Sequence, residues 1–474
     1  MFHLNEVMSG HNPGCWFRLI WFRVIVSFLG LLALAGCGGS STSFQQQPGV
    51  SITGSPPSAI GVGANWQYTA TVSGTQNQKV TWTISPSTAG TIDANTGLYI
   101  APLTVPNPAT VTITATSQAD TNQSAQTTVT VQANDPLGTV SGVTALPSCV
   151  GYSSWNLTPA CYQMTVSCPG VADLTTYLKV INPSGLPAGT VLFGVGTGGS
   201  GLYDDSQTYS YGYQVVENVV NAGFNTVEVS FGGPFTSNQP YGWLQGPGGV
   251  RRLACRYATV ANWVYNNPKT INPNPNNTAT NSAPMCATGN SGGSGAIGYA
   301  VYAYGLDSEL AMIEPTSGPP MARIDQGCSS SCAGLQGPVC SNSSNVATMC
   351  YEPADASVID EAYQAAGASS PTPCTDSINQ NPGTDAASLF LSDSIVYAPS
   401  NVPIRLPNTT VKVLFGDLDT SNAVPEGMVW EESILPSSFS PIPLNQCLPG
   451  VAHDIPSYFT GATQIATDII TMCK

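Results

Sequence analysis

The spacing of apolar residues along the chain changes near residue 134. From Gly49 to about Gln132, short alternations of apolar and polar residues, rich in Val, Thr and Ile, are separated by Gly, Pro and Asn turns, the pattern of β-strands. Beyond Pro136, apolar runs of strand length alternate with stretches of helical spacing, which indicates helices packed on a mostly parallel sheet. Two domains also suit a length of 474 residues, because single hydrophobic cores rarely grow so large.

The first domain, residues 49–133, is predicted to be a small antiparallel β-sandwich. Its strands are short, and no helical period lies between them. The expected strands are Trp66–Val72, Lys79–Ile84, Ala109–Ala115 and Thr127–Val131. The runs Val80-Thr81-Trp82, Gly90-Thr91-Ile92 and Gly97-Leu98-Tyr99, followed by Ala101-Pro102, resemble the bacterial Ig-like domains of surface proteins. The resemblance implies a spacer, or less commonly a module that binds a glycan or a partner.

The second domain, residues 134–474, is predicted to be an α/β domain. Its expected strands are Thr190–Val195, Thr226–Phe231, Pro284–Thr288, Leu310–Ile313 and Val411–Phe415. Its expected helices are Tyr213–Ala222, Val250–Tyr265, Gly295–Tyr304 and Ala462–Met472, and the second of these carries Arg251, Arg252 and Arg256 on its polar side. The stretch Cys328–Ala386 has five cysteines and little periodicity, so we expect an insertion held by disulfides.

Residues 1–36 have the pattern of an export signal. Arg18 and Arg23 precede an apolar run, Val24–Ala35, that is too short to span a bilayer. Leu34-Ala35-Gly36-Cys37 resembles the lipobox of bacterial lipoproteins, which implies cleavage before Cys37 and a lipid anchor on its thiol. Residues 37–48 are rich in Gly, Ser and Gln, as in a flexible tether. We therefore expect an exported lipoprotein, held at the cell surface or outer membrane or released from the cell. The alternative is an ordinary signal peptide that is followed by a cysteine.

Composition limits the classes of partner and cofactor. The formal net charge of −15 argues against nucleic acid as a partner. Of the 14 cysteines, Cys15 and Cys37 belong to the signal region, which leaves an even number of 12 in the exported domains. An even count in an exported chain predicts disulfides. Zinc binding is disfavoured, because the sequence has no Cys-x-x-Cys pair and no histidine cluster beside these cysteines. No metal or other cofactor is expected, and the oligomeric state is left open.

The strongest candidate for chemistry is Ser291. Gly289-Asn290-Ser291-Gly292-Gly293 fits the Gly-x-Ser-x-Gly nucleophile elbow, in which small neighbours allow a strained turn to expose the serine hydroxyl. The expected strand and helix on either side are the context that the motif requires. A glycine- and serine-rich surface loop is the alternative interpretation.

A serine needs a base to take its proton, and imidazole fills this role well at neutral pH. The chain has three histidines, and only His453 lies outside the signal region, in a Gly/Pro loop before the last helix. A carboxylate should orient the imidazole of His453. Asp419 is the first choice, because it follows the expected strand Val411–Phe415 and lies three residues after Gly416. Asp417 is the second candidate and Asp325 the third.

When a serine attacks a carbonyl group, negative charge develops on the carbonyl oxygen, and this oxyanion needs backbone N–H donors. Gly292, directly after the serine, is expected to supply one of them. The glycine-rich run after the strand Thr190–Val195 is expected to supply another, from Gly196, Thr197 or Gly198. Phosphate binding by this run is disfavoured because no Gly-Lys-Ser/Thr closes it.

The order Ser291, Asp419, His453 resembles that of the α/β-hydrolase family, and the resemblance spans most of residues 136–474. It implies a carboxylic ester hydrolase that works through an acyl-enzyme. Exported feruloyl or tannin esterases of this family carry cysteines directly before the serine and after the histidine, where this chain has Asn290 and Asp454.

A surface binding or adhesion protein that has lost activity is the alternative function, and peptidase activity would use the same residues. The sequence does not identify the ester, whose fit should depend on the Cys328–Ala386 insertion.

Overall fold

The computed structural model describes residues 48–474 apart from 54–58, 63–64, 103, 150–157, 234, 236–240, 332–335, 339–344, 365–369, 381–385, 397–403, 405 and 435–443. The expected signal peptide, Cys37 and nearly all of the tether lie outside the described residues. Within the described part, no helix is long and apolar enough to cross a membrane.

The N-terminal part is all-β, as its alternating pattern predicts. Its sheets have the orders β2-β9-β8-β5 and β3-β7-β6, and β1 pairs with β4. The alternate residues of β8 are buried, and they share one apolar core with Trp66, Trp82 and Tyr99. The expected strand Trp66–Val72 is divided at Tyr68, on either side of which the chain joins different sheets. The strands are β1 (Gly49–Thr53), β2 (Ala59–Gly61), β3 (Asn65–Gln67), β4 (Thr69–Ser73), β5 (Val80–Ser85), β6 (Thr91–Ile92), β7 (Leu98–Ile100), β8 (Thr110–Ser117) and β9 (Ser124–Gln132).

The C-terminal part is built on a nine-stranded sheet with the order β10-β11-β12-β14-β13-β15-β16-β19-β20. The run from β14 to β20 is parallel, whereas β10, β11 and β12 pair antiparallel at one edge. The mostly parallel sheet confirms the α/β class. The strands are β10 (Thr139–Ala145), β11 (Ala160–Ser167), β12 (Leu174–Ile181), β13 (Gly189–Gly194), β14 (Phe224–Phe231), β15 (Met285–Asn290), β16 (Leu310–Thr316), β19 (Thr410–Gly416) and β20 (Leu444–Leu448).

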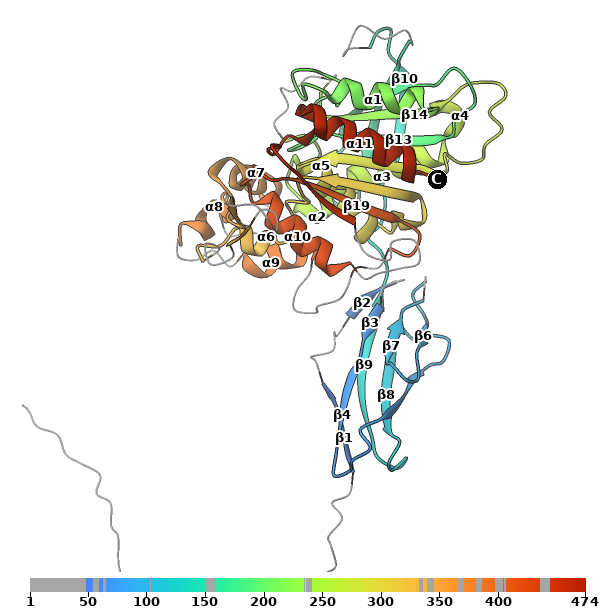
Figure 1. Cartoon of the computed structure of the whole chain (residues 1–474), viewed down its shortest axis with the longest axis vertical. Helices are drawn as coiled ribbons and strands as arrows, with labels where there is room; N and C mark the ends of the chain where they lie inside the picture. The colour runs from blue at the N-terminus through green and yellow to red at the C-terminus, as the bar shows by residue number, and fades with distance from the viewer. Residues whose placement is uncertain are drawn as a thin grey trace, which may run out of the picture. The chain divides into compact units, whose positions relative to one another are not determined.

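Helices cover both faces of this sheet (Figure 1). On one face α1 (Gly212–Asn221) packs beside α11 (Phe459–Met472), and on the other α3 (Cys255–Asn266) packs on α5 (Gly292–Tyr302). Neighbouring residues of β13 point into opposite cores, because side chains alternate along a strand: Leu192 joins the α3 and α5 side, and Phe193 joins the α1 and α11 side. The other helices outside the insertion include α2 (Val250–Leu253), α4 (Pro268–Ile271), α6 (Ile324–Gly327), α9 (Ala387–Asp393), α10 (Ala423–Ser433), η1 (Gly242–Leu244), η2 (Leu306–Ser308) and η4 (Ile455–Ser457).

The expected helix Val250–Tyr265 is corrected in two respects. It is divided into α2 and α3 at Ala254, and Arg256 is buried rather than on a polar face, with 1% of its surface exposed. The guanidinium donates to the carbonyl oxygens of Trp243 at 2.9 Å and Ala172 at 2.8 Å, and these acceptors compensate for its burial. Burial lowers the pKa of Arg256 to about 10.

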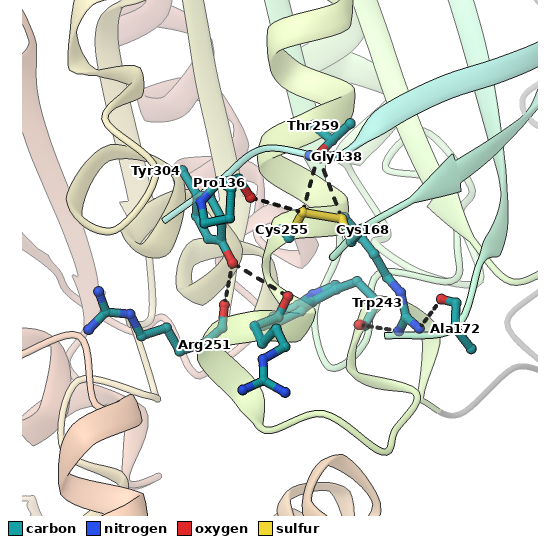
Figure 2. Close-up of a disulfide and its surroundings, with 11 residues drawn as sticks. Pro136, Gly138, Cys168, Ala172, Trp243, Arg251, Cys255, Thr259 and Tyr304 are labelled. Atoms are coloured by element: carbon teal, nitrogen blue, oxygen red, sulfur yellow. Dashed lines mark hydrogen bonds between the residues drawn. A yellow bond between two sulfur atoms is a disulfide. The ribbon is translucent and has the colours of Figure 1, made fainter. Parts of the chain in front are cut away.

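Disulfides are present, as the even cysteine count predicts, and they join both neighbouring and distant segments of the chain. The bridges between described residues are Cys149–Cys161, Cys168–Cys255, Cys286–Cys473 and Cys328–Cys374. Cys350 and Cys447 are disulfide-bonded as well. In Figure 2 the Cys168–Cys255 bridge lies beside Thr259, whose hydroxyl accepts a hydrogen bond from the Gly138 N–H at 2.8 Å. This cluster holds α3 against the first antiparallel strands.

The insertion Cys328–Ala386 contains more regular structure than its sequence pattern suggests. It includes β17 (Gln336–Pro338), β18 (Val346–Thr348), α7 (Pro353–Tyr363) and α8 (Pro373–Ile378). The Cys328–Cys374 bridge holds α8 to the chain just after α6, and the Asp360 carboxylate of α7 accepts from the Cys374 N–H at 2.6 Å. These tertiary contacts stabilise short helices that a periodicity argument overlooks.

Candidate active site

Ser291 lies on a sharp turn between β15 and α5, as the Gly-x-Ser-x-Gly motif predicts. Its backbone angles are φ 51° and ψ −119°, a strained region for a residue with a side chain. A Cβ atom on Gly289 would lie 2.8 Å from the carbonyl carbon of Gly293, and one on Gly293 would lie 2.8 Å from the oxygen of Gly194. The turn therefore requires glycine at both motif positions, which explains the local sequence.

His453 lies in the loop between β20 and η4, next to the carboxylate of Asp419. Its Nδ1 atom is 3.0 Å from Asp419 Oδ2 and 3.0 Å from the hydroxyl oxygen of Ser421. Asp419 is buried, with 1% of its surface exposed, whereas the His453 side chain is 35% exposed. A carboxylate on Nδ1 favours the tautomer that carries its proton there, which leaves Nε2 free to act as a base.

The three candidate carboxylates have different partners. Only Asp419 contacts His453. The side chain of Asp417 instead accepts a hydrogen bond from the Gly450 N–H at 2.7 Å, in the loop that leads to the histidine. Asp325 is paired with Arg323 through two hydrogen bonds of 2.8 Å. This geometry favours the first choice made from the sequence over the other two.

The pKa values of this pair move in opposite directions. Burial alone would raise the pKa of Asp419, but hydrogen bonds from His453 and Ser421 hold it below its ordinary value. Burial lowers the pKa of His453, but Asp419 outweighs it, with Asp454 and Asp355 contributing, so the net shift is upward. The carboxylate therefore remains charged at neutral pH and stabilises the imidazolium form that a general base passes through.

The candidate residues share one cavity of about 420 Å³. Thr197, Ser291, Gly292, Asp419 and His453 all line it. The insertion forms one wall, as expected, with Tyr351, Glu352, Asp355, Val358 and Ile359. A cavity of this size, lined by both apolar and polar groups, suits a small molecule or the end of a larger one.

The backbone of Thr197 lies against the serine turn. Its nitrogen is 2.8 Å from the position that a Cβ atom on Gly292 would occupy, so the backbone of Thr197 lies close to that of Gly292. The other two candidates have different surroundings: the Gly196 N–H donates to the Tyr209 hydroxyl at 2.9 Å, and the Gly198 carbonyl accepts from the Trp243 N–H at 2.8 Å. Neither Gly196 nor Gly198 lines the cavity. The structure thus favours Thr197 among the three.

Two residues of the site are absent from the expectations based on sequence. Ser421 follows the acid by two residues, and its N–H donates to Asp419 Oδ1 at 3.0 Å. Asp355 belongs to the insertion and lies close enough to His453 to affect its pKa. Serine after an aspartate is common in turns, and nothing in the sequence links the insertion to the histidine, so no local pattern identifies either residue.

In the part of the chain that the structure describes, no group of three or more His, Cys, Asp or Glu side chains could hold a metal ion.

No protein-family model and no curated protein matches this sequence. Several solved structures are similar to it over most of their length. An esterase from Pyrobaculum calidifontis is 15% identical, with 66% of this chain and 85% of that chain covered and a TM-score of 0.40. Acetyl xylan esterase 1 from Thermoanaerobacterium is 14% identical, with 71% and 88% covered and a TM-score of 0.40. A carboxyl esterase from Bacillus coagulans is 14% identical, with 66% and 99% covered and a TM-score of 0.39.

Proposed function

We propose that the α/β domain is a carboxylic ester hydrolase with Ser291 as nucleophile, His453 as base and Asp419 as the acid that orients it. The observation that carries this proposal is the 3.0 Å contact between His453 Nδ1 and Asp419, in the same cavity as a serine on a strained turn. The backbone N–H groups of Gly292 and Thr197 would bind the oxyanion. A strained serine turn and a buried carboxylate on the one imidazole among the described residues support a catalytic role.

The proposed reaction has two halves. Ser291 Oγ bonds to the ester carbonyl carbon while its proton moves to His453 Nε2, and the tetrahedral intermediate then expels the alcohol, which takes that proton. The acyl group remains on Ser291. Water next attacks the acyl-enzyme, gives a proton to His453, and releases the carboxylic acid as that proton returns to Ser291. No external oxidant, reductant or metal is required.

We further propose that the chain is an exported lipoprotein anchored at Cys37, with residues 49–133 as an Ig-like spacer. Support comes from the signal-like residues 1–36, the all-β N-terminal part, and the disulfides, which persist in oxidising compartments. Radiolabelled palmitate should enter the wild-type chain expressed in a bacterium, and Cys37→Ala should abolish the incorporation. An unlabelled wild-type chain would contradict the anchor without bearing on the hydrolase.

The full chain, purified with its disulfides intact, is expected to hydrolyse short p-nitrophenyl esters. Ser291→Ala removes the attacking oxygen, so turnover should fall by at least about 10³-fold, and a fluorophosphonate should label the wild type but not the variant. The measurements are the release of p-nitrophenol and the mass of the labelled peptide. A folded wild type that shows neither turnover nor labelling would favour the non-catalytic binding protein instead.

The two aspartates after β19 offer a matched pair for the role of the acid. Asp419→Asn should lower kcat by about 10³–10⁴-fold, because the amide no longer enforces the required tautomer of His453. Asp417→Asn alters a side chain of the same type two residues away that contacts Gly450 rather than the imidazole. It should retain most activity. Equal losses in the two variants would show that the loop as a whole, and not the His453 contact, is responsible.

A further inference from the structure

Tyr209 is a buried side chain whose hydroxyl meets the backbone of the expected oxyanion loop. It accepts a hydrogen bond from the Gly196 N–H at 2.9 Å, and its residue is only 3% exposed. Its ring packs edge-on against that of Tyr203, with the ring centroids 5.1 Å apart. Burial raises the pKa of Tyr209 far above neutrality, so the group remains a neutral phenol. Tyr209 does not line the cavity and has no part in the mechanism described above.

The same hydroxyl lies where three segments of the site meet. Besides Gly196, its pKa is influenced by the side-chain amide of Asn290, directly before the serine, and by the carboxylate of Asp454, directly after the histidine. Asn290 is fully buried; its Nδ2 donates to Asp454 Oδ1 at 3.5 Å, and its Oδ1 accepts from the hydroxyl of Thr316 at 2.8 Å. One polar network therefore joins the glycine loop, the serine turn and the histidine loop.

The hydrogen bond to Tyr209 restricts the Val195–Gly196 peptide, one unit before the peptide that carries the Thr197 N–H. Thr197 has φ 49°, a conformation that is unfavourable for a β-branched residue and persists only where surrounding contacts enforce it. The carbonyl oxygen of Thr197 would lie 1.9 Å from a Cβ atom on Gly292, so the loop and the serine turn are in close contact. A small rotation of the loop would turn the Thr197 N–H away from the reacting carbonyl.

We propose that Tyr209 is a positioning residue of the oxyanion site, which acts by holding the Gly196 amide so that the Thr197 N–H faces the same point as the Gly292 N–H. The inference rests on the ester-hydrolase function proposed above. Tyr209 makes no contact with the substrate, and its effect is transmitted through the Gly196–Thr197 peptide. Electrostatic stabilisation depends on donors fixed before the charge develops, so such a support should affect the transition state more than the bound ester.

Tyr209→Phe tests this by removing a single oxygen atom. We expect kcat for p-nitrophenyl acetate to fall by about tenfold or more, with KM changed by less than about twofold. The affinity for a trifluoromethyl ketone, which forms a tetrahedral adduct with serine, should fall by the same factor as kcat. Unchanged kcat and unchanged ketone affinity would overturn the proposal.

Tyr203→Phe is the matched control. It removes a neighbouring hydroxyl that is also buried but makes no hydrogen bond to the Gly196 loop within the described residues. It should leave kcat and ketone affinity near the wild-type values. If both variants lose activity in proportion to their loss of thermal stability, Tyr209 is only a packing residue and the proposal is wrong.

Amide hydrogen exchange in the wild-type protein provides a test that does not depend on the folding of a variant. The Gly196 N–H should exchange slowly because it is bonded inside the protein, whereas the Thr197 N–H should exchange faster and become protected when the ketone binds. Fast exchange at Gly196 would overturn the proposal. A wild type that neither hydrolyses esters nor binds the ketone would refute the proposed hydrolase as well, whereas normal turnover with fast Gly196 exchange would refute only the role of Tyr209.

Discussion

Several carboxylates, and not only that of Asp419, raise the pKa of His453. Burial lowers its pKa, Asp419 raises it by more, and Asp454 and Asp355 add smaller upward contributions. The imidazole must be neutral to accept a proton from Ser291. The ratio kcat/KM should therefore rise with pH through a midpoint above the ordinary imidazole value of 6.5.

Asp355→Asn should move this acid limb to lower pH. The substitution removes a negative neighbour that stabilises the imidazolium, so the pKa of His453 should fall. The measurement is the pH profile of kcat/KM for a neutral ester. Glu352→Gln is the control, because Glu352 lines the same cavity but is not among the main influences on His453. Equal shifts of the pH profile in Asp355→Asn and Glu352→Gln, or no shift in Asp355→Asn, would contradict this role of Asp355.

Individual elements of the site follow from local sequence to different degrees. Strand β15, the serine turn and helix α5 were predictable, because a short apolar strand, two obligatory glycines and a helical run lie within a few residues of each other. Helix α7 was not, because its stability depends on the Cys328–Cys374 bridge and on the contact between Asp360 and α8. The burial of Arg256 was also missed, since its carbonyl acceptors come from distant segments.

The bridge Cys286–Cys473 links β15, the strand that leads to Ser291, to the end of the last helix, across a sequence separation of 187 residues. Replacing both cysteines by Ala should destabilise the folded protein by about 2–5 kcal/mol, since the unfolded chain gains much freedom when a long loop is opened. The shorter bridge Cys149–Cys161 closes only 12 residues, so its removal should reduce the stability less. Urea unfolding of the two variants measures the difference. A larger loss from opening the shorter loop would show that native packing, rather than loop closure, controls stability.

Across the whole molecule, the cavity gathers side chains that are far apart in the sequence. Thr197, Ser291, Asp355, Asp419 and His453 come from the ends of different strands and from the insertion. The charged groups that line the cavity are the acids Glu352, Asp355 and Asp419 and one histidine, and none of the described lining residues is Lys or Arg. A cleft lined by one sign of charge repels ligands of that sign.

Esters that carry a positive charge should therefore be better substrates than neutral ones of the same shape. Acetylcholine and its neutral isostere, 3,3-dimethylbutyl acetate, form a suitable pair, and kcat/KM should favour the cation by about tenfold at low ionic strength. The preference should weaken in about 0.5 M salt, which screens the exposed acids Glu352 and Asp355 at the cavity rim. Equal kcat/KM values at low salt would show that this charge does not select the substrate.

Residue order alone was sufficient to predict the all-β N-terminal part, the mostly parallel sheet that follows it and the serine turn, and it suggested the candidate partners of Ser291. Periodicity, glycine spacing and the single histidine after residue 36 can be read from the order of residues alone. The preference for Asp419 over Asp417 and Asp325, the preference for Thr197, and the role proposed for Tyr209 rest on the three-dimensional structure. Each depends on which loops meet at the carboxyl ends of parallel strands, and those distances are set by the packing of the whole sheet.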